Sequence, residues 1–146
     1  MDANIRKGTV ADLEAVCAVD AVAADDAARR ERIARALRDS QISVLVVDGR
    51  IAGYGLLSRS FFGHPFIELV IIEHALRGGG LGPRLVEHLS DLAGPGKLFT
   101  STNASNTHMQ HVLTKLGFEQ SGVIYNLDPG DPELVYFKAV RREGAQ

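Results

Sequence analysis

The chain is poor in the features that build disulfide frameworks and membrane spans. Only one of its 146 residues is cysteine, Cys17, so no internal disulfide can form, which fits a reducing compartment. Cys17 falls in an apolar helical segment, where we expect a core thiol rather than a nucleophile. No apolar run is long enough to cross a membrane and no signal-like segment opens the chain, so we expect a cytoplasmic protein with no membrane partner.

An excess of charge of one sign is also missing. The formal net charge is -2, and both signs are interspersed along the chain. A nucleic-acid groove or a basic membrane-binding surface needs clustered positive charge, so neither is expected. Five arginines crowd residues 29–38, but acidic residues lie among and beside them, which is typical of a solvated helix face. The length fits a single domain over residues 1–146.

Several enzyme motifs are absent. No Gly-Lys-Ser/Thr tripeptide is present, which excludes a Walker A loop, and Pro83 takes the place of the third glycine in a dinucleotide fingerprint. The chain has no G-x-S-x-G nucleophile elbow. His108 and His111 share a helix face, but no cysteine or nearby acid completes a zinc set, so no metal is expected.

The most informative feature present is the glycine-rich turn Arg77-Gly78-Gly79-Gly80-Leu81-Gly82. Residues 66–72 before it are apolar and β-branched enough to form a buried strand, and leucines recur at helical spacing over residues 80–92 after it. A glycine turn that opens a helix gathers unpaired N–H groups at the positive end of the helix dipole. It therefore predicts a site for phosphate oxygens, with a plain strand-to-helix connection as the alternative.

The other segments complete an α/β or α+β sandwich, because helices alternate with strands. Asp48-Gly49 predicts a hairpin turn, and Gly53 and Gly55 predict a bulge or a close approach by a ligand. Strands are expected over residues 5–7, 42–47, 51–57, 66–72, 98–102, 123–127 and 134–138, and helices over residues 10–19, 25–38, 80–92 and 105–116. The inner face of the second helix is expected to carry Ala27, Ile33, Ala34 and Leu37.

Two motifs carry a family resemblance. Arg77, Gly80 and Gly82 satisfy the pattern Arg-x-x-Gly-x-Gly, and Asn106 is followed by Lys115-Leu116-Gly117-Phe118. With both motifs the chain resembles the GCN5-related N-acetyltransferases, the GNAT superfamily, closely over residues 66–125 and elsewhere through the order of its elements. The resemblance implies a mixed, mostly antiparallel central sheet flanked by helices, in the order β-α-α-β-β-β-α-β-α-β-β, and acetyl-CoA as the cosubstrate.

The resemblance also implies how acetyl-CoA is held. The backbone of the glycine turn holds the pyrophosphate, and the pantetheine arm pairs with the strand before it. Arg77 then contacts the phosphates, or else is a solvated loop arginine, and Asn106 contacts the cofactor arm, caps a helix, or does both. The implied cofactor-binding residues are Val70, Ile71, Ile72, Arg77, Gly78, Gly79, Gly80, Leu81, Gly82, Pro83 and Asn106.

Acetyl transfer needs a donor for the oxyanion and a base for the ammonium group of the acceptor. A backbone N–H at the end of the strand, from Ile71 or Ile72, would polarise the thioester carbonyl, and we choose Ile72. Glu68 is the predicted base, acting directly or through a water, because it is the one acid inside an otherwise apolar strand segment. It also matches a glutamate of polyamine-acetyltransferase-like members. The alternatives are that Glu68 begins the strand and faces solvent, or that Glu73 is the base.

One position departs from the family pattern. Many members carry a tyrosine general acid where this chain has Leu113, which lies on the apolar face of its helix. Tyr125 or Tyr136 then protonates the leaving sulfur, or the thiolate leaves unaided, or the chain is not an enzyme. The alternative function is a non-catalytic acyl-CoA-binding sensor or regulatory module.

By resemblance, the acceptor enters near residues 22–26, 58–65 and 126–133. Asp128, Asp131 and Glu133 could attract a cationic amine, although the neighbouring proline and glycine residues favour a plain turn. Phe61 and Phe62 either line an acceptor pocket or fill the core. The expected partner is a small-molecule or peptide amine, and the sequence leaves open whether the chain forms a homodimer.

Overall fold

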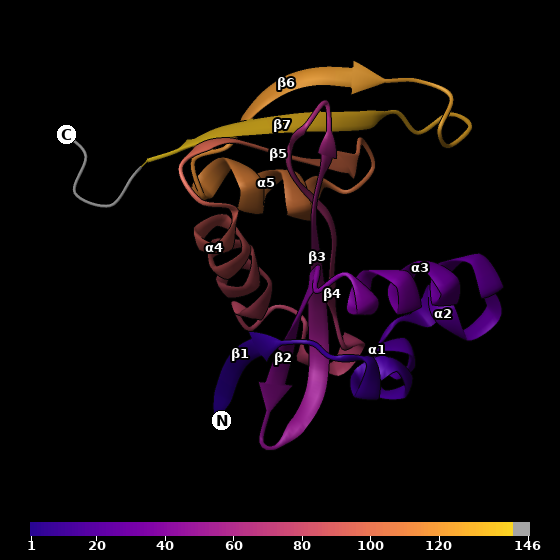
Figure 1. Cartoon of the computed structure of the whole chain (residues 1–146). Helices are drawn as coiled ribbons and strands as arrows, with labels where there is room; N and C mark the ends of the chain where they lie inside the picture. The colour runs from indigo at the N-terminus through magenta and orange to yellow at the C-terminus, as the bar shows by residue number, and fades with distance from the viewer. Residues whose placement is uncertain (142–146) are drawn as a thin grey trace. The chain divides into compact units, whose positions relative to one another are not determined.

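A computed structural model describes residues 1–141. Seven strands form one sheet in the order β1-β2-β3-β4-β5-β7-β6, in which β4 and β5 are parallel and the pairs β1–β2, β2–β3, β5–β7 and β6–β7 are antiparallel (Figure 1). The strands are β1 (Ala3–Lys7), β2 (Ile42–Val47), β3 (Arg50–Phe61), β4 (His64–Ile72), β5 (Gly96–Asn103), β6 (Glu119–Ile124) and β7 (Glu133–Val140). The α-helices are α1 (Leu13–Val19), α2 (Ala21–Asp25), α3 (Ala27–Arg38), α4 (Leu81–Ala93) and α5 (Thr107–Lys115). The predicted class, a mostly antiparallel sheet flanked by helices, is confirmed.

The chain folds into two compact units. The first unit contains Met1–Leu57 and Leu69–Leu89, and the second contains Ser58–Glu68 and the chain from Ser90 onward. Strands β3 and β4 and helix α4 each contribute residues to both units. The end of β4 and the glycine turn lie in the first unit, whereas Glu68 and Asn106 lie in the second.

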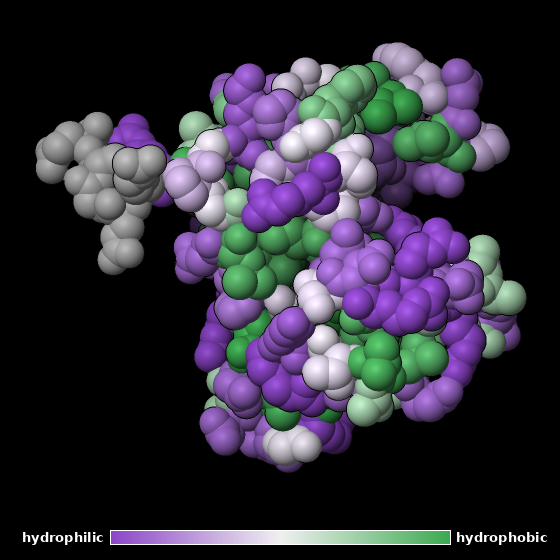
Figure 2. All heavy atoms as spheres, viewed as in Figure 1, coloured by the Kyte–Doolittle hydropathy of each residue, from purple (hydrophilic) through white to green (hydrophobic). Residues whose placement is uncertain are grey.

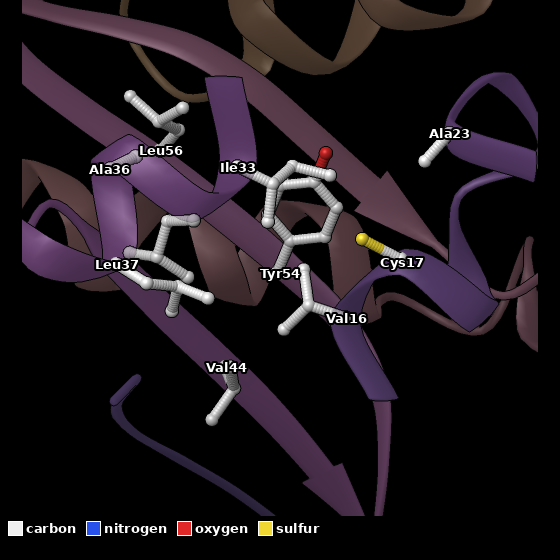
Figure 3. Packing of buried hydrophobic residues seen from close by; sticks show 10 residues of the cluster. Val16, Cys17, Ala23, Ile33, Ala36, Leu37, Val44, Tyr54 and Leu56 are labelled. Atoms are coloured by element: carbon white, nitrogen blue, oxygen red, sulfur yellow. The ribbon is translucent and has the colours of Figure 1, made fainter. Parts of the chain in front are cut away.

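The core of the first unit lies where α1, α2 and α3 cover one face of β2 and β3. Tyr54 of β3 is fully buried in this core, and Figure 3 shows its ring near Ile33 of α3 and Val16 of α1, with the sulfur of Cys17 turned toward it. Cys17 is 6% exposed, and burial raises the pKa of its thiol, which confirms the prediction of a core thiol. Leu69 and Ile71 of β4 pack against the same cluster.

The groups that closely approach Gly53 and Gly55 are other residues of the protein and not a ligand. Successive strand residues point to opposite faces, so these glycines face away from α1–α3 and toward α4. A Cβ atom on Gly55 would lie 2.5 Å from Leu89 Cδ1, and one on Gly53 would lie 2.7 Å from the carbonyl oxygen of Ile71. The predicted bulge is also found, as a register shift between Leu45 and Val46 of β2 relative to β3.

The two glycines are expected to tolerate alanine differently. Gly53→Ala should destabilise the protein by about 2–3 kcal/mol, because the backbone oxygen of Ile71 cannot move away cheaply. Gly55→Ala should cost less, since the end of the Leu89 side chain can turn aside. Urea unfolding measures both, with Gly122→Ala as the control because nothing lies within 4 Å of its added Cβ. Equal stability of Gly53→Ala and Gly122→Ala would contradict the account.

The helices of the first unit differ from the sequence prediction in two ways. The predicted helix over residues 10–19 opens as a 3-10 turn, Val10–Asp12, in which the Thr9 N–H donates to Asp12 Oδ2 at 2.8 Å. The helix predicted over residues 25–38 begins later, as α3, because Asp26 adopts an extended backbone, and a short helix that was not predicted, α2, precedes it. The carboxylate of Asp26 accepts from Ala28 N and Arg29 N, so it caps α3. Ala27 is exposed rather than internal.

The second unit contains β5, β7 and β6 side by side (Figure 1). The strand predicted over residues 123–127 is wrong in span, because β6 runs over Glu119–Ile124 with a register irregularity between Gln120 and Gly122. Every residue of β6 is exposed, and Figure 2 shows hydrophobic surface over its end, where Val123, Ile124 and Leu127 are exposed. Residues 58–65, expected as a loop, instead extend β3 and β4 into a hairpin with Phe62 and Gly63 at its tip.

Candidate active site

The glycine turn has the backbone geometry that its sequence predicts. Gly78 and Gly80 adopt φ values of 85° and 82°, which disfavour any side chain. Helix α4 follows at once, and the Arg84 N–H donates to the carbonyl oxygen of Gly80 at 3.3 Å, so Gly80 stands at the N-cap position. The turn therefore delivers the chain directly into the positive end of a 13-residue helix.

Gly79 and Gly82 leave room beside the backbone of the turn and of the first turn of α4. Neither has a positive φ, so neither needs to be glycine for conformational reasons. A Cβ on Gly82 would meet nothing within 4 Å, and one on Gly79 would meet only the oxygen of Leu76 at 3.7 Å. Packing within the described chain therefore does not require these glycines either. The room that they leave would let a phosphate group approach the backbone closely.

The donors at this turn are backbone N–H groups. Among the backbone hydrogen bonds that turns, loops and helix caps form within residues 1–141, none is donated by the N–H of Gly78, Gly79 or Gly80. Leu81 and Gly82 occupy the first turn of α4, where N–H groups have no intrahelical acceptor. Pro83 has no N–H, so this predicted cofactor-binding residue can line the turn but cannot donate to a phosphate.

The end of β4 has a fixed peptide orientation. The Glu73 N–H donates to the carbonyl oxygen of Ala52 on β3 at 2.8 Å. The carbonyl oxygen of Ile71 also faces β3, since it lies 2.7 Å from the position of a Cβ on Gly53. In a trans peptide the C=O and N–H point in opposite directions, so the N–H and C=O of Ile72 both point away from β3. Of the two predicted oxyanion donors, Ile72 is the one whose N–H is directed away from the neighbouring strand.

Arg77 meets the same strand end. Its Nε donates to the carbonyl oxygen of Ile72 at 3.1 Å. The sequence suggested that Arg77 contacts the phosphates or is a solvated loop arginine. Neither alternative predicted this hydrogen bond.

The two candidate bases lie in different surroundings. Glu68 is in the middle of β4, which begins at His64, so the alternative in which it begins the strand is wrong. It is half-buried, next to fully buried Ile67, whose carbonyl oxygen accepts from Thr100 Oγ1 at 2.9 Å. Glu73 follows the end of β4, and its carboxylate lies 2.8 Å from Arg50 Nη1. The carboxylate of Glu73 is thus engaged by a cation of β3.

Asn106 is a helix cap. Its side-chain oxygen accepts from the Met109 N–H at 3.1 Å at the start of α5, in the second unit. Leu113 is 1% exposed and belongs to the core of that unit, as predicted. Of the two tyrosines suggested as acids, Tyr125 is 67% exposed and Tyr136 is 5% exposed.

The acidic residues near residue 130 serve turn structure. Asp128 accepts from Asn103 Nδ2 at 2.9 Å, and Asp131 accepts from the N–H and hydroxyl of Ser105 at 3.0 and 2.6 Å. These contacts join the segment before β7 to the end of β5 and to the segment before α5. Within the segment, the Asp131 N–H donates to the carbonyl oxygen of Asp128 at 3.1 Å, as the turn interpretation predicts. Phe61 stacks on Phe66 with ring centroids 4.8 Å apart, whereas Phe62 is 89% exposed and does not fill the core.

Sequence reasoning missed a buried polar cluster formed by Asp20, Arg29 and Tyr54. Asp20 is 1% exposed and accepts four hydrogen bonds, from the Tyr54 hydroxyl at 2.5 Å, Arg29 Nη1 at 2.8 Å, and Val22 N and Ala23 N at 3.0 and 3.4 Å. Arg29 therefore does not belong to the solvated face that the arginine-rich pattern predicted. The sequence feature that could have indicated the cluster is Asp20, because an aspartate just before an alanine-rich segment is a typical N-cap residue.

The electrostatics of this cluster keep Asp20 ionised. Burial alone would raise the pKa of Asp20, but the hydrogen bonds from Tyr54 and Arg29 outweigh burial, so its pKa is lowered. Burial and the nearby carboxylate both raise the pKa of Tyr54. The cluster is an ion pair with a neutral phenol, and it joins α2 and α3 to β3.

Metal and membrane features are not found in the described part of the chain. Within residues 1–141 no group of three or more histidine, cysteine, aspartate or glutamate side chains is placed to hold a metal ion. None of the helices in that range is long and apolar enough to cross a membrane.

The fold and the glycine turn match a known family. The model of the acetyltransferase (GNAT) family matches residues 9–118, which include β4, the glycine turn, α4 and α5. The chain belongs to the GNAT acetyltransferase family. The cosubstrate of this family is acetyl-CoA, which agrees with the phosphate site predicted at the glycine turn. No curated protein sequence matches the chain significantly.

Solved structures similar to this GNAT chain extend over its whole length. A GNAT-family acetyltransferase from Bacillus cereus has 29% identity and a TM-score of 0.89, covering 97% of this chain and 100% of its own. The ribosomal-protein-S18-alanine N-acetyltransferase of Escherichia coli has 18% identity and a TM-score of 0.83, with 99% and 98% covered. The protein yncA of Salmonella typhimurium, whose structure contains acetyl-CoA, has 19% identity and a TM-score of 0.80, with 100% and 98% covered.

Proposed function

We propose that this protein is an N-acetyltransferase that moves the acetyl group of acetyl-CoA to a primary amine by direct attack. The observation that carries the proposal is the glycine turn that opens α4, in which Gly78 and Gly80 have φ values of 85° and 82° and Gly79 leaves room beside the backbone at the helix N-terminus. Membership of the GNAT family and the acetyl-CoA in a structural relative support it.

In this proposal the backbone holds the cosubstrate. The N–H groups of Gly78 to Gly82 donate to the pyrophosphate at the positive end of α4. The outward backbone groups at the end of β4, from Val70 and Ile72, pair with the pantetheine arm as an added strand would. Ile71 directs its carbonyl to β3, so its part in this pairing is smaller.

The chemical step then needs two groups of the chain. Glu68 takes a proton from the acceptor ammonium, directly or through a water, and the neutral amine attacks the thioester carbonyl. The Ile72 N–H stabilises the oxyanion of the tetrahedral intermediate. When the intermediate collapses, the carbon–sulfur bond breaks and the thiolate of CoA leaves. The extra proton on the attacking nitrogen passes to the thiolate or to solvent, which gives a neutral amide. A thiolate is a tolerable leaving group, so Leu113 in place of a tyrosine acid does not exclude turnover.

The proposed acceptor is a primary amine of a small molecule or a peptide. The E. coli relative is named as an N-acetyltransferase of an alanine of ribosomal protein S18, which makes a peptide that begins with alanine a suitable first probe. A second probe, spermidine, represents small cationic amines. Release of CoA with either probe would support the transferase function.

Replacing Glu68 should separate catalysis from binding. Glu68→Gln removes the proton acceptor but keeps the side-chain size, so kcat/KM for the amine should fall by about 10²- to 10⁴-fold. The Kd for acetyl-CoA, measured by calorimetry, should stay within about threefold, because binding rests on the backbone of the turn. Glu87→Gln, at an exposed position of α4, is the matched control.

The outcomes of this test distinguish the proposed roles. If Glu68→Gln keeps activity within a few-fold of the wild type, Glu68 is not the base. If the wild type binds acetyl-CoA but transfers its acetyl group to no amine tested, the non-catalytic acyl-CoA-binding module is the better description.

A further inference from the structure

The Ile72–Glu73 peptide unit is held at both ends. Its N–H, which belongs to Glu73, donates to the carbonyl oxygen of Ala52 at 2.8 Å. Its carbonyl oxygen, which belongs to Ile72, accepts from Arg77 Nε at 3.1 Å. A peptide unit is planar, so two hydrogen bonds in opposite directions fix the orientation of its plane.

We propose that Arg77 is a positioning residue, which fixes the Ile72–Glu73 peptide and thereby aims the Ile72 N–H, rather than a ligand for the cofactor phosphates. The inference rests on the proposed function, since it assigns the oxyanion contact to the Ile72 N–H. The N–H and C=O of Ile72 point to the same side of the strand. Rotation of the Ile72–Glu73 peptide, which carries the C=O, therefore also disturbs the direction of the Ile72 N–H.

The path of the chain supports this role. A short 3-10 turn, His74–Leu76, separates Ile72 from Arg77, and the Arg77 N–H closes that turn on the carbonyl oxygen of His74 at 3.3 Å. The Arg77 side chain then reaches back to the end of β4. Arg77 therefore links the strand end that would carry the oxyanion donor to the start of the phosphate-binding turn.

Side-chain chemistry allows the donor and the charge of Arg77 to be separated. Glutamine carries its amide nitrogen the same number of bonds from the backbone as Arg77 Nε, so it can donate to Ile72 without a charge. Lysine has a methylene at that atom, so it keeps the charge and loses this donor. Methionine has a methyl there and lacks both. The three variants Arg77→Gln, Arg77→Lys and Arg77→Met thus form a matched set.

We expect kcat to depend on whether the side chain of residue 77 can donate to the Ile72 carbonyl, and not on whether it is charged. Arg77→Gln should keep most of the wild-type kcat, whereas Arg77→Lys and Arg77→Met should lose about 10- to 10²-fold, a fraction of the loss on removing an oxyanion donor outright. The Kd for acetyl-CoA should stay within about threefold in all three variants, since the backbone N–H groups hold the phosphates. The effect thus falls on kcat and not on cofactor affinity.

A second readout does not depend on activity. Amide hydrogen exchange at Glu73 should match the wild type in Arg77→Gln and be faster in Arg77→Lys and Arg77→Met, because the peptide is then held at one end only. If no amine is acetylated by the wild type, the proposed function fails while this exchange result still decides the role of Arg77. Wild-type affinity in Arg77→Lys with weak acetyl-CoA binding in Arg77→Gln and Arg77→Met would overturn the inference in favour of a phosphate contact. Equal kcat and equal exchange in all variants would overturn it in favour of a solvated arginine.

Discussion

Gly82→Glu is expected to weaken acetyl-CoA binding by about 10²-fold or more, because a carboxylate near 4 Å from a phosphate repels it by several kcal/mol in a partly desolvated site. The new side chain would also fill the open space at the first turn of α4. Isothermal titration calorimetry with acetyl-CoA measures the loss directly. The fold should be unaffected, since nothing lies within 4 Å of the added Cβ and the backbone φ is not positive.

Gly122→Glu is the matched control for this experiment. Gly122 lies on exposed β6, likewise has nothing within 4 Å of an added Cβ, and likewise has no positive φ. The same charge change there should leave the Kd unaltered. Equal affinity of wild type and Gly82→Glu would remove the glycine turn as the phosphate site, and no binding to the folded wild type would contradict the cofactor assignment as a whole.

Asp20→Ala is expected to cost about 3–5 kcal/mol of unfolding free energy, the usual result of removing one partner from a buried ion pair. The substitution leaves the Arg29 guanidinium, whose side chain is 17% exposed, and the Tyr54 hydroxyl without their acceptor. It also removes the cap of α2. Urea unfolding at pH 7 measures the loss.

Asp26→Ala provides the comparison for Asp20→Ala. Asp26 caps α3 in the same way, through the N–H groups of Ala28 and Arg29, but it is exposed and has no ion pair recorded in the structure. Its loss should cost about 0.5–2 kcal/mol, the range for a cap alone. If the two variants are equally stable, burial of the Asp20 cluster contributes nothing beyond capping.

The pH dependence follows from the lowered pKa of Asp20. A folded-state pKa below the unfolded value of about 3.9 means that the stabilisation is complete above that pH and is lost as the pH falls through the folded-state pKa. The stability gap between the wild type and Asp20→Asn should therefore be constant from about pH 7 to pH 5 and narrow below about pH 4. A gap that stays constant down to pH 2 would contradict the ionised state of Asp20.

The Asp20 cluster also bears on the acceptor. The resemblance placed the acceptor entrance near residues 22–26, which comprise most of α2 and the α3 cap Asp26, and the start of α2 is held by Asp20. Through Tyr54 and Arg29 the cluster fixes α2 and α3 to β3 within the first unit. A loss of stability in Asp20→Ala would thus report on the segment that we expect to face the acceptor.

Much of the site could be predicted because it depends on local backbone chemistry. The strand, the glycine turn and the helix are consecutive in sequence, so periodicity and glycine spacing were enough to place them. The position of Asn106 at a helix start also predicted its capping role, which Met109 N confirms. Capping needs only the three residues that follow, and these are known from the sequence.

The errors arose where distant residues decide the outcome. The arginine-rich helix was expected to have a solvated face, but Arg29 pairs with Asp20, nine positions away, inside the first unit. Gly53 and Gly55 predicted a bulge, which is found, or the close approach of a ligand, whereas Ile71 and Leu89 are the groups that approach them closely. Composition gives no sign of which residue will lie opposite a glycine.

The sequence by itself determined most of the order of the elements, the glycine turn before α4 and the family, because these follow from short-range periodicity and from motif residues close together in the chain. Only the tertiary structure decided which side chains of that framework meet. It paired Arg77 with the Ile72 carbonyl, Glu73 with Arg50, and Asp20 with Tyr54. Such partners are selected by the packing of strands and helices, in which a hydrogen bond of 3 Å depends on the position of the whole backbone and not on neighbours in the sequence.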